Sequence, residues 1–70
     1  MTWAQKWTKE VEKQIIELDT DKYKLAKLLG VPYSTLCRHI AHPEKTNSED
    51  LRMMARALRF SPEQQLIMFK

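Results

Sequence analysis

Glycine and proline are scarce in this sequence, and that scarcity limits its possible folds more than any other feature. Gly30 is the only glycine among 70 residues, and there are three prolines. Hairpins and short strands need clusters of such turn-forming residues. The sequence therefore predicts an all-α protein of five short helices. A chain of this length has room for one domain, residues 1–70, and not for a second.

The first predicted helix covers about residues 2–18. Its apolar side chains recur every three or four residues, so they share one side of a 3.6-residue helix. The polar residues 19–21 interrupt this pattern and end the helix. We expect the apolar side to close a small core. Its members are Trp3, Trp7, Val11, Ile15 and Leu18.

Residues 21–41 predict two shorter helices that are joined by a tight turn. Asp21 is a good N-cap for a helix over residues 22–29. Gly30 ends that helix, because glycine adopts the left-handed conformation without a steric cost. Pro32 suits the start of the next helix, over about residues 33–41, and Pro43 stops it. Two short helices around such a turn form the helix-turn-helix layout.

Two further helices follow a polar loop of residues 42–46. Asn47 is the expected N-cap of the fourth helix. The strongest capping signal is Ser61 with Gln64 three residues later, and it starts a fifth helix over about residues 62–69. A two-turn helix at the chain end cannot bury four apolar side chains against one core. We therefore expect Leu66 and Phe69 to face inward, and a homodimer interface at Ile67 and Met68.

Basic residues are concentrated in the middle of the chain. The net charge is +3, from 12 Lys and Arg against 9 Asp and Glu. Residues 22–45 hold five basic residues and one acidic residue, whereas residues 1–21 hold three basic residues and five acidic residues. A basic patch on a small domain favours a polyanionic partner.

Other features of the sequence argue against several classes of protein. The longest apolar run, residues 66–69, is too short to cross a membrane, and the N-terminal residues do not resemble a secretory signal. The single cysteine, Cys37, fits a reducing compartment. Cys37, His39 and His42 are too few and too divergent on a helix for a zinc site. Because a reducing compartment is expected, we predict a cytoplasmic protein. Because the sequence contains no catalytic constellation, we expect that it is not an enzyme. We also expect it to use no metal, cofactor or small-molecule substrate.

The segment from Leu25 to Leu36 resembles the helix-turn-helix of the lambda-repressor-like proteins, the phage repressor and Cro family. Ala26 and Gly30 match the small residue and the turn glycine of that family, and Val31 and Leu36 match its buried positions. Residues 47–51 and 55–61 are similar to the family's fourth-helix pattern, so the resemblance covers roughly residues 10–70. The chain departs from the family where Lys22 replaces a frequent Gln, where Pro32 replaces a Ser, and where Arg59 stands at a C-cap that is usually Gly.

The resemblance implies that the helix over residues 33–41 enters the major groove of duplex DNA. It implies base contacts by Tyr33, Ser34, Thr35 and Arg38, of which Arg38 is the best candidate because its fork matches guanine O6 and N7. The phosphate candidates, which would position the domain without reading sequence, are Lys22, Lys24, Lys45, Thr46 and Asn47.

The same resemblance implies a transcriptional repressor of the phage or plasmid kind. It would act as a homodimer on a near-palindromic operator, in the bacterial nucleoid or in the cytoplasm of a phage-infected host. Two alternatives stay open. One is a helix-turn-helix module that binds a protein, as an antirepressor or an inhibitor of a host enzyme does. The other is the DNA-recognition fragment of a recombinase or transposase.

Each candidate contact also has an ordinary structural interpretation. The lysines fit a solvated helix face, and Arg38 fits a surface salt bridge with Glu44. Ser34 and Thr35 fit local capping of their own helix. His39 fits a partly buried histidine, and Cys37 fits a small, half-buried filler of the packing.

Overall fold

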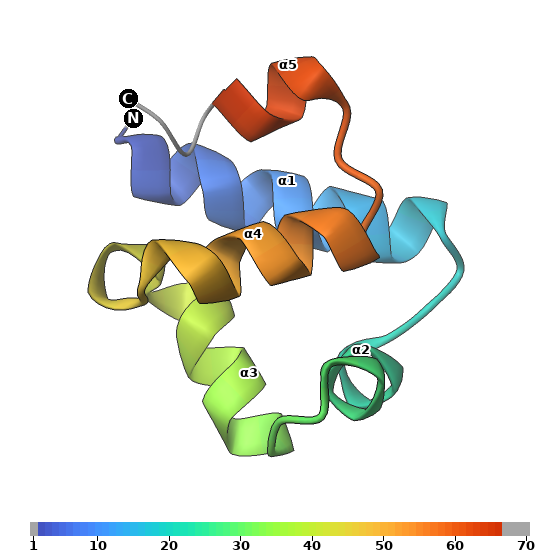
Figure 1. The fold of residues 1–70 in the computed structure, drawn as a ribbon. Helices are drawn as coiled ribbons and strands as arrows, with labels where there is room; N and C mark the ends of the chain where they lie inside the picture. The colour runs from blue at the N-terminus through green and yellow to red at the C-terminus, as the bar shows by residue number, and fades with distance from the viewer. Residues whose placement is uncertain (1, 67–70) are drawn as a thin grey trace.

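The computed structural model describes residues 2–66, and within them all regular secondary structure is helical (Figure 1). The all-α prediction is therefore confirmed for this part of the chain. No helix of the described residues is both long enough and apolar enough to cross a membrane. The elements are α1 Trp3–Glu17, α2 Lys22–Leu29, α3 Tyr33–Ala41, a 3-10 turn Pro43–Lys45, α4 Ser48–Ala57 and α5 Pro62–Gln65.

The predicted capping residues set the starts of these helices. The Asp21 side chain accepts a hydrogen bond from the Lys24 N–H at the start of α2. Asn47 accepts one from the Asp50 N–H at the start of α4. Ser61 and Gln64 form a reciprocal capping box at α5. Side-chain acceptors of this kind satisfy backbone N–H groups that have no partner inside the helix, so they determine where a helix begins. The predicted starts of α2, α4 and α5 are confirmed.

The helices are arranged around a core to which each helix from α1 to α4 contributes. In Figure 1, α5 lies above α1 and α4, and α2 and α3 lie below them. Trp7 lies at the centre with no exposed surface, and its ring stands 6.5 Å from that of Phe60. Burial of this much apolar surface is the main force that holds so short a chain together. The other core residues are Val11, Ile15, Leu25, Ala26, Leu36, Ile40, Leu51, Met54, Ala55 and Leu58.

The structure corrects two expectations about the loops and the end of the chain. Residues 43–45 form a turn of 3-10 helix, and Pro43 in it is buried. Leu66 does not face inward: it is 59% exposed. The reason is that α5 meets the rest of the protein through polar side chains, since Gln64 contacts Glu10 and Gln65 donates to the Phe60 carbonyl. The expected inward side chain of Phe69 and the expected dimer interface at Ile67 and Met68 lie outside the described residues.

Candidate nucleic-acid interface

A three-residue turn fixes the angle between α2 and α3. Gly30 has a left-handed backbone with φ of +71°, and its N–H donates to the Lys27 carbonyl. The Val31 N–H then donates to the Ala26 carbonyl, 3.0 Å away. Pro32 is extended and begins α3 without a side-chain cap. The chain therefore turns tightly enough for α3 to pack directly against α2, as the single glycine predicts.

One side of α3 is anchored in the core, and the opposite side faces solvent. Leu36 and Ile40 are 0% and 3% exposed. Ser34 and Arg38, one helical turn apart, are exposed together, and Tyr33 is exposed at the start of the helix. Thr35 is half-buried. Of the four predicted base contacts, the structure thus brings three to the open surface and one to its margin. These four residues are Tyr33, Ser34, Thr35 and Arg38.

The C-terminal end of α3 is held by a hydrogen bond from α1. The Thr8 hydroxyl lies 2.7 Å from the Ile40 carbonyl oxygen and 3.0 Å from that of Ala4 in its own helix. The last carbonyl groups of a helix have no partner inside it, so a donor from another helix fits there. The end of α3 near residue 40 is fixed to α1, whereas its Tyr33 end lies against Tyr23 of α2.

The loop before α4 contains three of the predicted phosphate contacts, and the structure distinguishes between them. Lys45 is exposed. Asn47 uses its side-chain oxygen to cap α4, which leaves the NH₂ group of the amide as a donor. The Thr46 hydroxyl is already engaged, at 3.1 Å from Nδ1 of His39 and 3.2 Å from the His42 carbonyl. Thr46 is therefore the weakest candidate of the three.

His39 links α3 to the start of α4. Its Nδ1 meets Thr46, and its Nε2 lies 3.8 Å from Oδ2 of Asp50. The residue is half-buried, as expected from the sequence. Glu44, which was a possible salt-bridge partner of Arg38, instead lies 3.4 Å from His42. These contacts hold the loop before α4 against α3.

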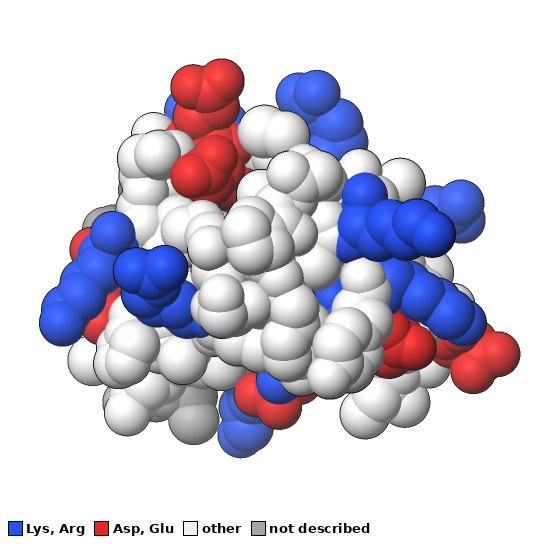
Figure 2. Space-filling view, turned by 90° about the horizontal axis from the view of Figure 1, so that it is seen from below, with Lys and Arg blue, Asp and Glu red and all other residues white. Residues whose placement is uncertain are grey.

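The surface formed by α2 and the start of α3 carries basic side chains. Of the two predicted phosphate contacts on α2, Lys24 is exposed and Lys22 is half-buried. Figure 2 shows the face of the molecule on the α2 and α3 side: an uncharged centre with Lys and Arg on both flanks and carboxylates at the margin. This arrangement suits a polyanion that lies across the face. The negative charges of the polyanion would lie against the basic flanks, and its uncharged parts would lie against the uncharged centre.

Two tyrosines meet on this surface, and only one of them, Tyr33, is a contact predicted from the sequence. The rings of Tyr23 on α2 and Tyr33 on α3 are 4.0 Å apart and nearly parallel, at 9°. A hydrogen bond with the Cys37 thiol is the main reason why the pKa of Tyr33 lies above its usual value of 10.0. A tyrosine with the ordinary pKa of 10.0 is already protonated in neutral solution, and the shift acts in the same direction. No local pattern reveals this pair, because the contact depends on the angle between the two helices.

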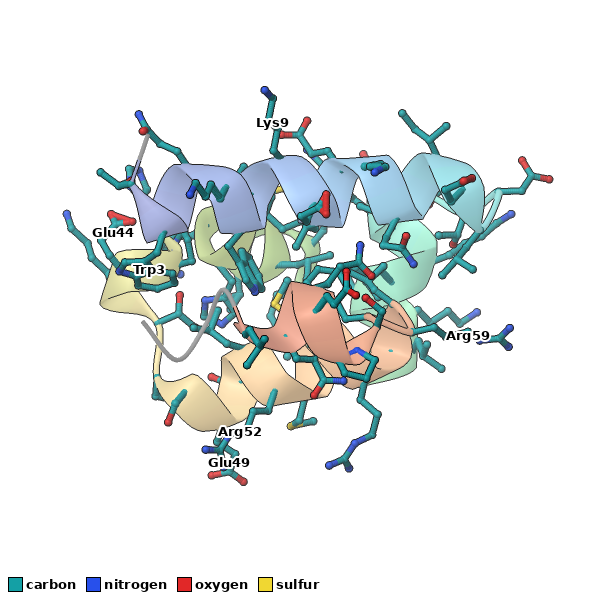
Figure 3. All side chains as sticks on the ribbon, turned by 90° about the horizontal axis from the view of Figure 1, so that it is seen from above. Trp3, Lys9, Glu44, Glu49, Arg52 and Arg59 are labelled. Atoms are coloured by element: carbon teal, nitrogen blue, oxygen red, sulfur yellow. The ribbon has the colours of Figure 1, made fainter. Side chains whose placement is uncertain are left out.

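An open hollow of the described surface lies elsewhere. It is an open groove of about 690 Å³ between the start of α1 and the 3-10 turn. Trp3 and Glu44 meet at its rim, as Figure 3 shows. None of the predicted DNA contacts lines it, so this groove and the surface of α2 and α3 are separate features of the molecule.

Comparison with protein-family models, with curated proteins and with solved structures gives no match. What the chain does is therefore inferred from the geometry of its own residues.

Proposed function

We propose that this protein binds duplex DNA through a helix-turn-helix formed by α2, the turn and α3, with α3 in the major groove. The observation that carries this proposal is the two-sided character of α3. Leu36 and Ile40 fix one side in the core, while Ser34 and Arg38 stand in solvent on the other. The major groove is wide enough to accept an α-helix, and the residues at the start of such a helix reach the base edges.

The residues divide into two roles. Arg38, with Ser34 and Tyr33 beside it, reads bases, because the guanidinium fork pairs with guanine O6 and N7. The exposed Lys24 and Lys45 contact phosphates, which gives affinity and salt dependence but no sequence preference. The secondary contacts are Thr35 at the margin of the surface, Lys22, the amide of Asn47 and, least strongly, Thr46.

The biological role that fits best is transcriptional repression by a homodimer. Two copies of α3 about 34 Å apart would enter successive major grooves and read a near-palindromic operator. Repression would follow from occupying a promoter. The expected dimer residues, Ile67 and Met68, belong to this proposal and lie outside the described residues.

Selection of bound duplexes from a random-sequence pool tests the proposal. We expect an enriched motif with two-fold symmetry. Enrichment of a single, asymmetric half-site would retain DNA binding but remove the dimer, and would favour a recombinase-like recognition fragment. A pool that stays random would overturn sequence-specific binding and favour a module that binds a protein through α3.

Arg38 provides the sharpest test by substitution. We expect Arg38→Ala to weaken binding to the selected duplex by about 1–3 kcal/mol and to relax specificity at one base pair. Arg38→Lys is the matched control, because it keeps the charge and loses the fork, and it should show the same relaxed specificity. Lys9→Ala, a charge change on the exposed side of α1 (Figure 3), should leave the preference unchanged. An unaltered preference in both Arg38 variants would remove its role in base reading.

A further inference from the structure

The stacked pair of Tyr23 and Tyr33 leaves a large aromatic surface in water. Tyr23 is 68% exposed and Tyr33 is 39% exposed, although both belong to helices that pack on the core. Exposed large apolar groups that are gathered at one place are informative, whereas single ones are not. The parallel stack at 4.0 Å covers one face of each ring and restricts both side chains. The pair therefore presents a fixed apolar surface.

This surface lies where a base edge would meet the protein. Tyr33 is the first residue of α3, beside Ser34, and Tyr23 is the second residue of α2. Lys22 and Lys24 precede and follow Tyr23 in the sequence. Lys24 is exposed on α2, and Figure 2 shows Lys and Arg on both flanks of the uncharged centre on the α2 and α3 side. These positive charges favour a polyanionic occupant over an apolar peptide.

The major groove of DNA offers one apolar group to such a surface. Base edges there display hydrogen-bond donors and acceptors, and only thymine adds a methyl group, at C5. We propose that the Tyr23–Tyr33 pair selects thymine in the recognised duplex by packing against its C5-methyl group. Tyr33 makes the contact, and Tyr23 is a positioning residue that holds the Tyr33 ring. This inference rests on the proposed DNA-binding function and names the base preference of the same site.

The hydroxyl group of Tyr33 is compatible with this role. A tyrosine is uncharged in neutral solution, and the neighbouring Cys37 raises the pKa of Tyr33 further, so no negative charge stands beside the DNA. The ring rather than the hydroxyl makes the methyl contact. Tyr33→Phe should consequently keep the preference for thymine.

The test replaces thymine with uracil, which removes the C5-methyl group and preserves base pairing. The probe is the duplex that the protein itself enriches from the random pool, with uracil introduced first at all thymines and then at one position at a time. Loss of one buried methyl group corresponds to about a fourfold weaker affinity. We expect that loss at one position or a few positions and no change at the others, measured by fluorescence anisotropy.

Four variants assign the effect to the tyrosine pair. Tyr33→Ala should abolish the difference between thymine and uracil, and Tyr23→Ala should reduce it. Tyr33→Phe should retain it. Ile16→Ala, which removes a side chain that is 80% exposed on α1, should also retain it and is the matched control. Circular dichroism verifies that each variant is folded before binding is measured.

The outcomes separate this inference from the proposed function. Two results would overturn methyl recognition and leave DNA binding intact. In the first, replacing thymine with uracil does not change the affinity for the duplex. In the second, Tyr33→Ala still shows a difference between thymine and uracil. A motif in which no position requires thymine would do the same. A pool without any retained duplex would overturn both.

Discussion

Gly30→Ala is expected to destabilise the protein through backbone conformation alone. Gly30 has φ of +71°, and a Cβ atom placed there would have no atom within 4 Å. The left-handed conformation costs a residue with a Cβ about 1–2 kcal/mol. Alanine offsets about 0.4–1 kcal/mol of this by reducing the freedom of the unfolded chain. The free energy of unfolding should fall by about 1 kcal/mol, which lowers the melting temperature by roughly 4–8 °C in a domain of this size.

Arg59→Gly is the mirror experiment on the same protein. Arg59 is exposed, follows α4 and has φ of +57°; its side chain points away from the helices in Figure 3. Glycine removes the left-handed penalty there, so the free energy of unfolding should rise by about 1 kcal/mol. Urea denaturation followed by circular dichroism measures both variants. A loss above about 3 kcal/mol in Gly30→Ala would imply a steric clash and refute the reasoning, as would a loss of stability in Arg59→Gly.

Two further predictions concern individual contacts. Thr8→Val keeps the shape of the side chain but removes the donor to the Ile40 carbonyl, so the free energy of unfolding should fall by about 1 kcal/mol; an unchanged urea midpoint would show that this bond contributes nothing. Tyr33, measured by phenolate absorbance in a Tyr23→Phe background, should ionise above pH 10.0, and Cys37→Ala should lower that pKa. Because the folded state holds the proton more tightly than the unfolded state, stability should be intact below pH 10.0 and should fall as the pH rises through the folded-state pKa; a stability that rises over this range would contradict the direction of the shift.

The features that the sequence predicted depend on residues close together in the chain. The bounds of α2 and α3 follow from Asp21, Gly30 and Pro32, each of which acts on a backbone group within a few residues. The exposed and buried sides of α3 follow from the i, i+4 spacing of Leu36 and Ile40. These signals are local, so they survive without knowledge of how the helices pack.

The features that the sequence did not predict depend on how the elements pack, including elements that are close together in the chain. The stack of Tyr23 on Tyr33 requires a particular angle between two helices. The predicted inward orientation of Leu66 was wrong: α5 has no buried residue, and its Gln64 and Gln65 side chains bond to Glu10 and to the Phe60 carbonyl. The internal bonds of Thr46 depend on the 3-10 turn, which the pattern of residues 42–46 did not indicate. The bonds of Thr46 and of Gln65 span few residues, but they form only once the chain has adopted these particular turns.

Helix α1 holds the C-terminal ends of two other helices in this small fold. Thr8 donates to the last turn of α3, and Gln14 Nε2 donates to the Leu58 carbonyl at the end of α4, 2.7 Å away. In both cases α1 holds the C-terminal end of the other helix, where carbonyl groups lack partners. The N-terminal end of α3, with Tyr33, is left to be positioned by the turn at Gly30 and by the ring of Tyr23. If α3 binds DNA as proposed, substitutions in the turn and in the tyrosine stack should therefore change DNA recognition more than substitutions in α1 do.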